Sequence, residues 1–356
     1  MTTKLVYVLT CAPDATFIEQ ALMAIFSARY WNPDAHIVLI VDDLTDKLLV
    51  NKRGEILDYI SEKIVVPFDA DKSAHYRSRW LKTSVRELIK GNYLFIDCDT
   101  IVTRNISSIE QIDADIAMVC DENISIVEEI FSALRPTIEN CSKVGVDISK
   151  EKYYFNSGVM YVRDTRLTHQ LYRKWHEFWL EGVAQGINVD QPTFAKANIA
   201  CGRPVVLIEN RWNAIVKSEI EDIYSAYILH FWHSVSFLYF EKCLQYIREN
   251  GLTDFIRYYV LHPTETFLPS DSHISLYKCQ NYIHLYHVLR RVLRAYGTTI
   301  DPSFDSFAIG MRTQTLILCA LHHHMYSIAA LIVVVSKWYR VSVSGKFVYK
   351  TNKYSK

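Results

Sequence analysis

The segment that decides the fold class is Tyr93-Leu94-Phe95-Ile96-Asp97-Cys98-Asp99-Thr100-Ile101-Val102. Its first four residues are apolar and are typical of a buried strand. Two acidic residues, Asp97 and Asp99, follow the strand directly. In open α/β sheets, ligands bind beyond the carboxyl ends of the strands. The segment therefore predicts a buried strand that places two carboxylates at a ligand-binding edge.

The chain on both sides of this segment alternates between strand-like and helix-like runs. We expect further strands at 5–10, 36–41, 64–66, 116–120, 158–162 and 205–208, and helices at 16–29, about 44–60, 79–90 and 166–180, with another helix beginning at Asp190. This βαβα order argues for an α/β domain around a largely parallel sheet. The alternation fades past about residue 240. We expect a catalytic domain at 1–240 and a helical, basic C-terminal extension at 241–356.

The composition excludes several classes of protein. Half of the 356 residues are hydrophobic and 22% are charged, which is too apolar for a disordered chain. Lys+Arg 39 balances Asp+Glu 39, so no overall charge favours nucleic acid as a partner. The 8 Cys form no C-x-x-C pair, which argues against a zinc site of that type. No signal peptide precedes the first strand, and we expect a cytoplasmic protein.

The two carboxylates of the central segment suit a metal ion. On an extended backbone, Asp97 and Asp99 point to one side and Cys98 points away. Two oxygen ligands on one side are typical of a site for a hard cation such as Mg²⁺ or Mn²⁺. The alternative is a solvated turn at the end of a strand.

Five segments of the sequence, in order, resemble one known family. They are "SRWLKTSVRELIKGNYLF", "YLFIDCDTIV", "YYFNSGVMYV", "NVDQPTF" and "ENRWNAI…YILHF", within about residues 4–233. Together they resemble the nucleotide-sugar glycosyltransferases of the GT-A fold, in the retaining branch that includes glycogenin and the lipopolysaccharide α-galactosyltransferases. The resemblance implies a GT-A domain that moves a hexose-like sugar from a nucleoside diphosphate, UDP in most such enzymes, to a glycan or lipid-linked glycan.

The resemblance also implies a metal site. Asp99 corresponds to the main carboxylate ligand, Asp97 shares the metal or contacts the donor ribose, and His230 corresponds to the third ligand. An imidazole among carboxylates favours Mn²⁺ over Mg²⁺ as the cofactor. Two alternatives stay open. His230 can instead be a packed residue of the aromatic run 229–233, and His233 competes for the role of ligand.

Further residues are assigned to the donor by the same resemblance. Arg79 and Lys82 lie one helical turn apart, and one of them holds the donor diphosphate or sugar; a solvated basic helix face is the alternative. Thr10, Ala12 and Asp42 fall at the ends of the first two strands, where the family holds the nucleoside. The first strand-to-helix turn lacks G-x-G-x-x-G, which argues against a dinucleotide site.

The transferred sugar is assigned to a third group of residues. Asn156, Ser157 and Gly158 correspond to the Asn-Ser-Gly segment, where Gly158 permits close approach of the backbone to a ligand or forms a bulge. Asp190 and Gln191 correspond to the catalytic Asp-Gln pair. Asp190 binds sugar hydroxyls or stabilises positive charge at the anomeric carbon, and it is also expected to cap the following helix.

The sequence departs from the family pattern after His230. A glycine and a lysine that usually follow the histidine are missing. Arg211, Lys217 or Lys242 are candidates to replace the lysine, which neutralises the departing diphosphate. The departure leaves a catalytically inactive relative that binds a nucleotide or glycan as the main alternative. A sugar nucleotidyltransferase is less well supported, because the turn at 10–14 has neither Gly nor Lys.

The C-terminal sequence is basic and partly apolar. No acidic residue follows Asp305, while seven Lys or Arg residues do. An apolar run at 315–335 is interrupted by three histidines at 322–324. Such a segment suits the anionic inner face of a membrane, and an ordinary packed helix or a spanning helix are the alternatives. We expect a cytoplasmic enzyme with a peripheral membrane contact.

Overall fold

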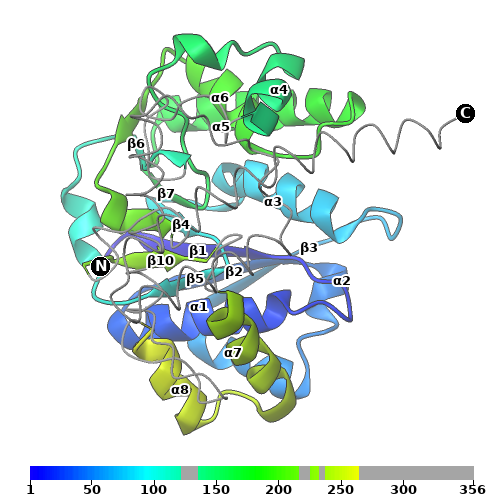
Figure 1. Ribbon diagram of the computed structural model, residues 1–356, viewed down its shortest axis with the longest axis vertical. Coiled ribbons are helices and arrows are strands. Elements are labelled where there is room, and N and C mark those ends of the chain that lie inside the picture. Colours follow the sequence, from blue (N-terminus) through cyan, green and yellow to red (C-terminus); the bar gives the residue numbers. More distant parts are fainter. Residues whose placement is uncertain (122–134, 216–224, 232–236, 264–356) are drawn as a thin grey trace, which may run out of the picture. The chain divides into compact units, whose positions relative to one another are not determined.

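A seven-stranded sheet forms the centre of the N-terminal unit, Met1–Gln280 (Figure 1). The computed structural model describes residues 1–121, 135–215, 225–231 and 237–263. The second unit, Asn281–Lys356, and with it most of the expected C-terminal extension, lies outside the described residues. The domain boundary expected at residue 240 stays a prediction.

The strand order confirms the expected α/β class. It runs β3 (Glu62–Val66), β2 (Ile37–Asp42), β1 (Lys4–Leu9), β4 (Tyr93–Ile96), β7 (Val159–Val162), β6 (Ile116–Met118) and β8 (Val205–Leu207). The first four strands are parallel. β7 runs antiparallel to both β4 and β6, and β8 pairs parallel with β6. The start of β7 therefore meets the carboxyl ends of β4 and β6 at one edge of the sheet.

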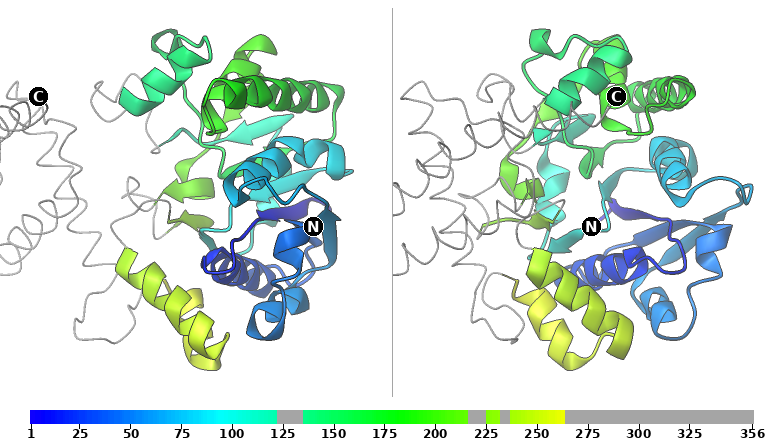
Figure 2. Two further views of the ribbon diagram at one scale, coloured as in Figure 1. Left: turned by 90° about the vertical axis from the view of Figure 1, so that its right-hand side faces the viewer. Right: turned by 45° about the vertical axis from the view of Figure 1, so that its right-hand side comes forward.

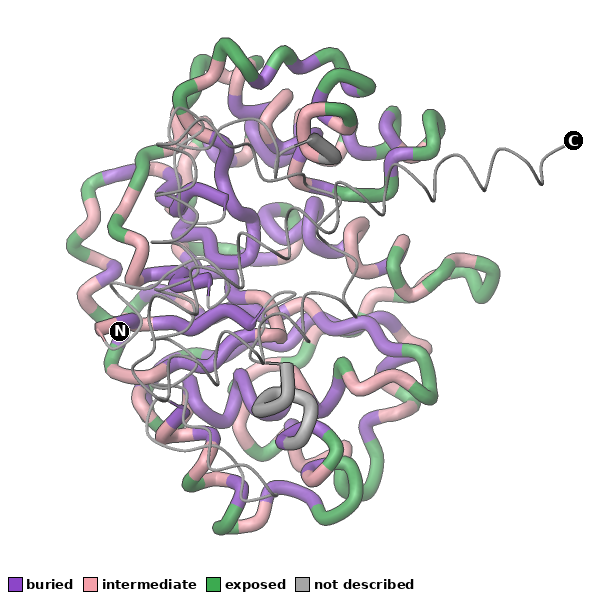
Figure 3. Tube along the Cα trace, viewed as in Figure 1, coloured by how far each residue is buried: buried purple, intermediate pink, exposed green. Residues whose placement is uncertain are grey.

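The central strands are apolar on both faces, which explains their continuous hydrophobic runs. In β4, Leu94 and Ile96 pack into one core, while Tyr93 and Phe95 pack into the other. All four of these side chains are buried, and Figure 3 shows the same burial along the neighbouring strands.

Helices cover both faces of the sheet, as Figures 1 and 2 show. On one face lie α1 (Phe17–Trp31), the 3₁₀ helix η1 (Asn51–Tyr59), α7 (Phe237–Asn250) and α8 (Asp254–Leu261). On the other lie α3 (Ala74–Leu88), α5 (Arg166–Ala184) and α6 (Gln191–Ala200). The shorter helices are α2 (Asp43–Asp46), α4 (Arg135–Lys143), η2 (Ser107–Gln111), η4 (Ile148–Lys150) and η5 (Asn210–Asn213). Within the described ranges, no helix has both the length and the apolar character that crossing a bilayer requires.

A second, three-stranded sheet carries the predicted histidine. It consists of β5 (Thr100–Val102), β10 (Ile228–His230) and β9 (Ala214–Ile215). β10 runs antiparallel to β5, with His230 opposite Thr100. This pairing brings a residue from far along the chain next to the two aspartates.

Three local predictions were wrong. The helix expected at about 44–60 is divided into α2 and η1. α3 begins at Ala74 rather than at residue 79, because the Ser73 hydroxyl accepts a hydrogen bond from the Tyr76 backbone N–H at 3.1 Å. Residues 97–99 form a bend between β4 and β5 rather than extended backbone.

Candidate functional site

Asp97, Asp99 and His230 form a cluster in which each offers one ligand atom, and these atoms lie within 4.8 Å of one another. His230 Nε2 is 3.3 Å from Oδ1 of Asp99. The histidine side chain is almost fully buried, whereas the two carboxylates are partly exposed. The bend after β4 therefore brings both aspartates to one place, although not by the extended geometry that the spacing suggested.

The three groups shift one another's pKa values. Burial alone lowers the pKa of His230, but the charge of Asp99 and the hydrogen bond to it outweigh this, so the pKa lies above its ordinary value. Burial alone raises the pKa of Asp99, but His230 outweighs it and the pKa is lowered. The pKa of Asp97 is raised, by burial first and then by the charge of Asp99, against the opposing effect of Lys82. The cluster thus holds negative charge that a cation stabilises.

The chemistry of the cluster fits a divalent metal ion. Carboxylate oxygens are ligands for Mg²⁺ and Mn²⁺, and an imidazole nitrogen adds affinity for Mn²⁺. Nδ1 of His230 lies 3.0 Å from Oδ1 of Asn213, so the other ring nitrogen faces the carboxylates. A metal-binding histidine usually makes such a hydrogen bond with its second nitrogen.

Two basic residues on one face of α3 converge on Asp190. The Arg79 Nε atom is 2.9 Å from Oδ1 of Asp190, and the Lys82 Nζ atom is 3.7 Å from Oδ2. Lys82 is almost fully buried and also donates to both carboxylate oxygens of Asp97 at 3.1 Å. Lys82 therefore joins Asp97 to Asp190, and its ammonium group is surrounded by carboxylates of the protein.

Asp190 lies immediately before α6, but its carboxylate does not cap the helix as predicted. It accepts a hydrogen bond from the Ser157 hydroxyl at 2.9 Å and pairs with the two cations of α3. Burial raises the pKa of Asp190, but Lys82, Arg79 and Ser157 together lower it to about 2. The neighbouring Gln191 is half-buried and hydrogen-bonds to Tyr154. Asp190 is therefore a permanent anion at neutral pH.

The segment 156–158 precedes β7 and enters the same edge of the sheet. The Asn156 side chain donates to Oδ1 of Asp121 at 2.8 Å and accepts from the Gly158 backbone N–H at 2.8 Å. A Cβ atom at Gly158 would lie 2.4 Å from Cε1 of His230. The space that a side chain needs at this position is filled by the histidine ring, which gives a third reason for glycine besides ligand approach and a bulge.

The residues assigned to the nucleoside have structural partners. The Thr10 hydroxyl donates to the Ala74 carbonyl at 2.7 Å, which ties β1 to α3. Asp42 is fully buried, caps α2 through the backbone N–H of Thr45 at 2.9 Å, and pairs with Arg77 at 3.2 Å. Ala12 lies exposed in the loop after β1. Of these three residues, only Ala12 offers its surface to solvent.

Two residues of the site were missed as individual candidates. Asp121 follows β6 much as Asp97 follows β4, so an acidic residue after a predicted strand was the signal that could have found it. Asn213 bridges Asn156 and His230, and its position in the Trp-Asn segment was the only hint. Both side chains are buried.

Of the three residues proposed to replace the family's missing lysine, only Arg211 has a side chain among the described residues. Arg211 pairs with Glu209, and its guanidinium lies over the ring of Tyr227, 4.9 Å from the centroid. Lys217 and His233, as well as the side chain of Lys242, lie outside the described residues. Arg211 is therefore held by partners of its own.

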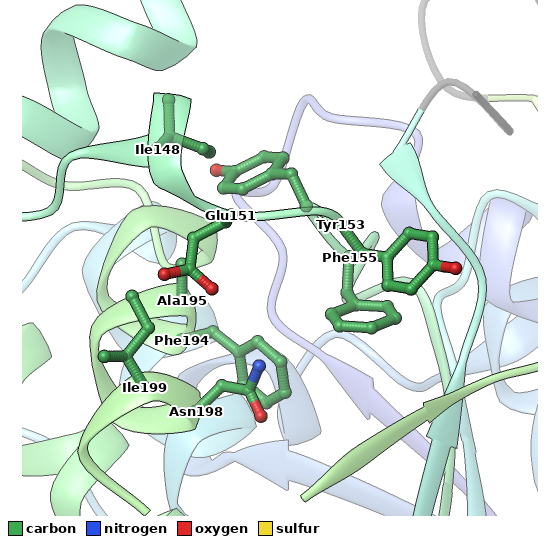
Figure 4. Close-up of a pocket in the computed structure, with 9 residues that line it drawn as sticks. Ile148, Glu151, Tyr153, Phe155, Phe194, Ala195, Asn198 and Ile199 are labelled. Carbon is green, nitrogen blue, oxygen red and sulfur yellow. The ribbon is translucent and has the colours of Figure 1, made fainter. Parts of the chain in front are cut away.

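A small cavity lies behind the segment that carries Asn156 and Ser157. Its volume is about 10 Å³, and its wall includes Phe155, Phe194 and Asn198 (Figure 4). That is room for about one water molecule. The cavity is too small for a sugar or a nucleotide. None of the residues that line it belongs to the aspartate cluster.

Among the solved structures that are similar to this chain, three illustrate the low identity. The WbbM bifunctional glycosyltransferase, in its apo form, is 13% identical, with a TM-score of 0.44 over 65% of this chain and 46% of that one. Mouse xyloside xylosyltransferase 1 is 16% identical, with a TM-score of 0.41 over 65% of this chain and 98% of that one. The galactosyltransferase LgtC, in complex with donor and acceptor sugar analogues, is 14% identical, with a TM-score of 0.45 over 72% and 99%. The chain thus spans about half the length of WbbM. No curated protein matches the sequence.

The sequence itself decides the family. The model of glycosyl transferase family 8 matches residues 13–235, which is more than half of the chain and includes Asp97, Asp99, Asp190 and His230. The GT-A α/β fold and the glycosyltransferase activity that the five segments implied are thereby confirmed. The protein belongs to glycosyl transferase family 8.

Proposed function

We propose that this glycosyltransferase uses a divalent cation, Mn²⁺ in preference to Mg²⁺, to transfer a hexose-like sugar from UDP to a glycan or lipid-linked glycan, with retention of configuration. The observation that carries the proposal is the convergence of Asp97, Asp99 and His230, whose ligand atoms lie within 4.8 Å of one another. These three residues are the proposed metal ligands. A cation bound there stabilises the negative charge that develops on a departing diphosphate.

The basic residues of α3 are proposed to have separate tasks. The ammonium group of Lys82 is enclosed by Asp97 and Asp190, and we assign it to holding these two carboxylates in place. Arg79 pairs with Asp190 but keeps 30% of its side chain exposed, so it is the better candidate for contact with the donor. This division refines the expectation that either residue holds the diphosphate.

Asp190 is proposed to contact the transferred sugar, together with Gln191, Asn156 and Ser157. With a pKa of about 2, Asp190 is ionised at neutral pH and is suited to accept hydrogen bonds from sugar hydroxyls or to stabilise positive charge at the anomeric carbon. Its low pKa also makes it a weak base, which is poorly suited to take the proton of the acceptor hydroxyl. Proton removal from the acceptor then falls to the leaving phosphate, as same-face displacement requires.

The location and acceptor rest on the sequence alone. We propose a cytoplasmic enzyme that contacts the membrane surface through its basic C-terminal segment, which lies outside the described residues. A flotation assay that compares the full chain with a chain ending before Ser306 tests this point. Equal partitioning of the two forms onto anionic vesicles would contradict it.

The metal centre is tested by calorimetric titration of UDP with and without Mn²⁺. We expect Mn²⁺-dependent binding in the wild type and its loss in Asp99→Ala. The matched control is Asp58→Ala, which removes an exposed carboxylate of η1 and should bind UDP as the wild type does. Absence of Mn²⁺-dependent binding in a folded wild type would overturn the proposal.

Turnover separates an enzyme from an inactive relative. A panel of UDP-sugars is incubated with the protein and Mn²⁺, and both released UDP and transferred sugar are measured. Release of UDP from one donor above the level of Asp99→Ala supports the proposed activity. Tight binding of UDP without release from any donor favours the inactive relative.

A further inference from the structure

A chain of buried polar side chains connects Asp121 to His230. Asn156 donates to Oδ1 of Asp121 at 2.8 Å, Asn213 donates to Oδ1 of Asn156 at 2.9 Å, and His230 Nδ1 lies 3.0 Å from Oδ1 of Asn213. None of these four side chains is more than 9% exposed. Buried polar groups are costly unless each is matched to a partner of the opposite kind.

The backbone of Gly158 fixes the direction of the hydrogen bonds that run from Asp121 to His230. The Gly158 N–H can only donate, so the Asn156 atom that lies 2.8 Å from it must be the amide oxygen. The Asn156 nitrogen then faces the Asp121 carboxylate, which accepts. Both anchors require the same orientation of the Asn156 amide.

The same orientation passes to the histidine. Because Asn156 offers an oxygen to Asn213, the Asn213 atom that faces it must be the nitrogen. The Asn213 oxygen then faces His230 Nδ1, and that nitrogen must carry a proton. The Nε2–H tautomer would set the lone pair of Nδ1 against the Asn213 oxygen inside the protein, whereas the Nδ1–H tautomer leaves the lone pair of Nε2 toward Asp99, where a cation can bind it. Nε2 is thereby kept as the atom that faces Asp99.

The position of the ring is fixed as well. The absence of a side chain at Gly158 leaves the space that Cε1 and Nδ1 of His230 occupy. The β10–β5 pairing sets the backbone of His230 opposite Thr100. The ring can therefore move little, and what Asn213 adds is the choice of which nitrogen is protonated.

We propose that Asn213 is a positioning residue which, through Asn156 and the Gly158 N–H, holds His230 as the Nδ1–H tautomer and so presents Nε2 to the metal. This inference rests on the proposed function, because it assigns a task toward the metal of that site. It adds Asn213 as a residue whose work is done through His230 rather than on the substrate, and it gives Asn156 a second task beside the proposed contact with the sugar. A fixed ligand nitrogen raises metal affinity, because no rearrangement of hydrogen bonds is needed when the cation binds.

The test uses Mn²⁺ titrations followed by electron paramagnetic resonance of the free ion, on the full chain without donor. Asn213→Ala is expected to weaken Mn²⁺ binding by about 10- to 100-fold. Asn213→Asp keeps an acceptor for Nδ1–H and is expected to bind Mn²⁺ more tightly than Asn213→Ala. The control is Asn32→Ala, which removes another buried asparagine. The Asn32 side chain accepts a hydrogen bond of 2.9 Å from the Ile106 N–H and is not part of the aspartate cluster. Wild-type affinity in a folded Asn213→Ala overturns the inference.

A second measurement works without any metal. Two-dimensional ¹H–¹⁵N spectra of histidine-labelled protein in alkaline buffer report which nitrogen of His230 is protonated, with His230→Ala providing the assignment. We expect a larger share of the Nδ1–H form in the wild type than in Asn213→Leu, where Asp99 still accepts from Nε2–H but the acceptor at Nδ1 is gone. Equal shares of the two tautomers in the wild type and in Asn213→Leu overturn the inference. If the wild type binds no Mn²⁺ but shows this change of tautomer, the proposed metal centre fails and the positioning role of Asn213 stands.

Discussion

The ring of His230 occupies the space that a side chain at position 158 would need. A Cβ atom on Gly158 would lie 2.4 Å from Cε1 and 2.9 Å from Nδ1 of the histidine. The glycine of the Asn-Ser-Gly segment and the histidine of β10 are 72 residues apart (230 minus 158) yet fit against each other directly. The choice of glycine is therefore explained by contact with a proposed metal ligand.

Gly158→Ala should displace His230. Overpacking of a buried site costs about 1 to 3 kcal/mol of unfolding free energy, and the shifted ring should also weaken Mn²⁺ binding. Urea unfolding and Mn²⁺ titration measure the two effects. Gly182→Ala is the matched control, since its new Cβ would lie 3.4 Å from Thr193 Cγ2 in ordinary contact. Equal Mn²⁺ affinity in Gly158→Ala and the wild type would show that the contact is unimportant.

Lys82→Met should destabilise the protein strongly. The substitution leaves Asp97 and Asp190 without their shared buried cation, and breaking a buried ion pair costs about 3 to 5 kcal/mol. Urea unfolding measures the loss, and adding Asp190→Asn should recover part of it, because one uncompensated charge is removed.

The control for Lys82 is Lys196→Met. Lys196 pairs with Glu181 at 3.3 Å, with about a third of the lysine side chain and more than half of the glutamate side chain exposed. Such a pair contributes about 0 to 1 kcal/mol. Similar losses in the two variants would mean that burial of Lys82 has no energetic consequence.

Asp190 should contribute stability that is lost in acid. Its pKa falls from an ordinary value of 3.8 to about 2 in the folded protein. A lowered pKa means that the contribution is complete above the unfolded value and disappears as the pH falls through the folded value. The shift of nearly two units corresponds to about 2 kcal/mol.

The comparison of wild type with Asp190→Asn isolates this contribution. The difference in unfolding free energy should be constant from neutral pH down to about pH 5 and should shrink below about pH 4. Urea unfolding of the metal-free proteins at a series of pH values measures it. A difference that keeps its full size in acid would be inconsistent with the lowered pKa.

Mn²⁺ should stabilise the folded protein. A ligand that binds only the folded state at about 100 times its Kd adds about 3 kcal/mol. The midpoint temperature of thermal unfolding should therefore rise by several degrees when Mn²⁺ is added and fall back to its metal-free value when a chelator removes the ion. His230→Ala should lose the shift, whereas His169→Ala, which removes a histidine of α5 that pairs with Asp164, should keep it. A shift that survives in His230→Ala would place the metal elsewhere.

Local sequence determined the sheet and its ligand-binding edge. The strand at 93–96 was predicted to the residue, and β1, β2 and β7 to within one residue at either end, because buried strands are continuous apolar runs. The five family segments were recognisable because each has a short characteristic pattern. The choice of Asp97, Asp99 and His230 as one group came from that resemblance and is matched by their convergence.

Tertiary structure alone decided how the site is held together. The spacing of Asp97 and Asp99 suggested an extended strand, whereas the chain bends there between β4 and β5, which belong to different sheets. Lys82 looked like a donor-binding residue on a helix face, but packing of α3 places its ammonium between Asp97 and Asp190. Nothing within a few residues of either aspartate reveals this ion pair.

The partners of Asn213, Gly158 and His230 were likewise invisible in the sequence. They lie on separate elements, and they meet because β7 runs antiparallel to β4 and β10 pairs with β5. Local patterns record which residues are buried and which follow a strand. Which donor meets which acceptor depends on the register between strands that are distant in the chain, and that register exists only in the folded protein.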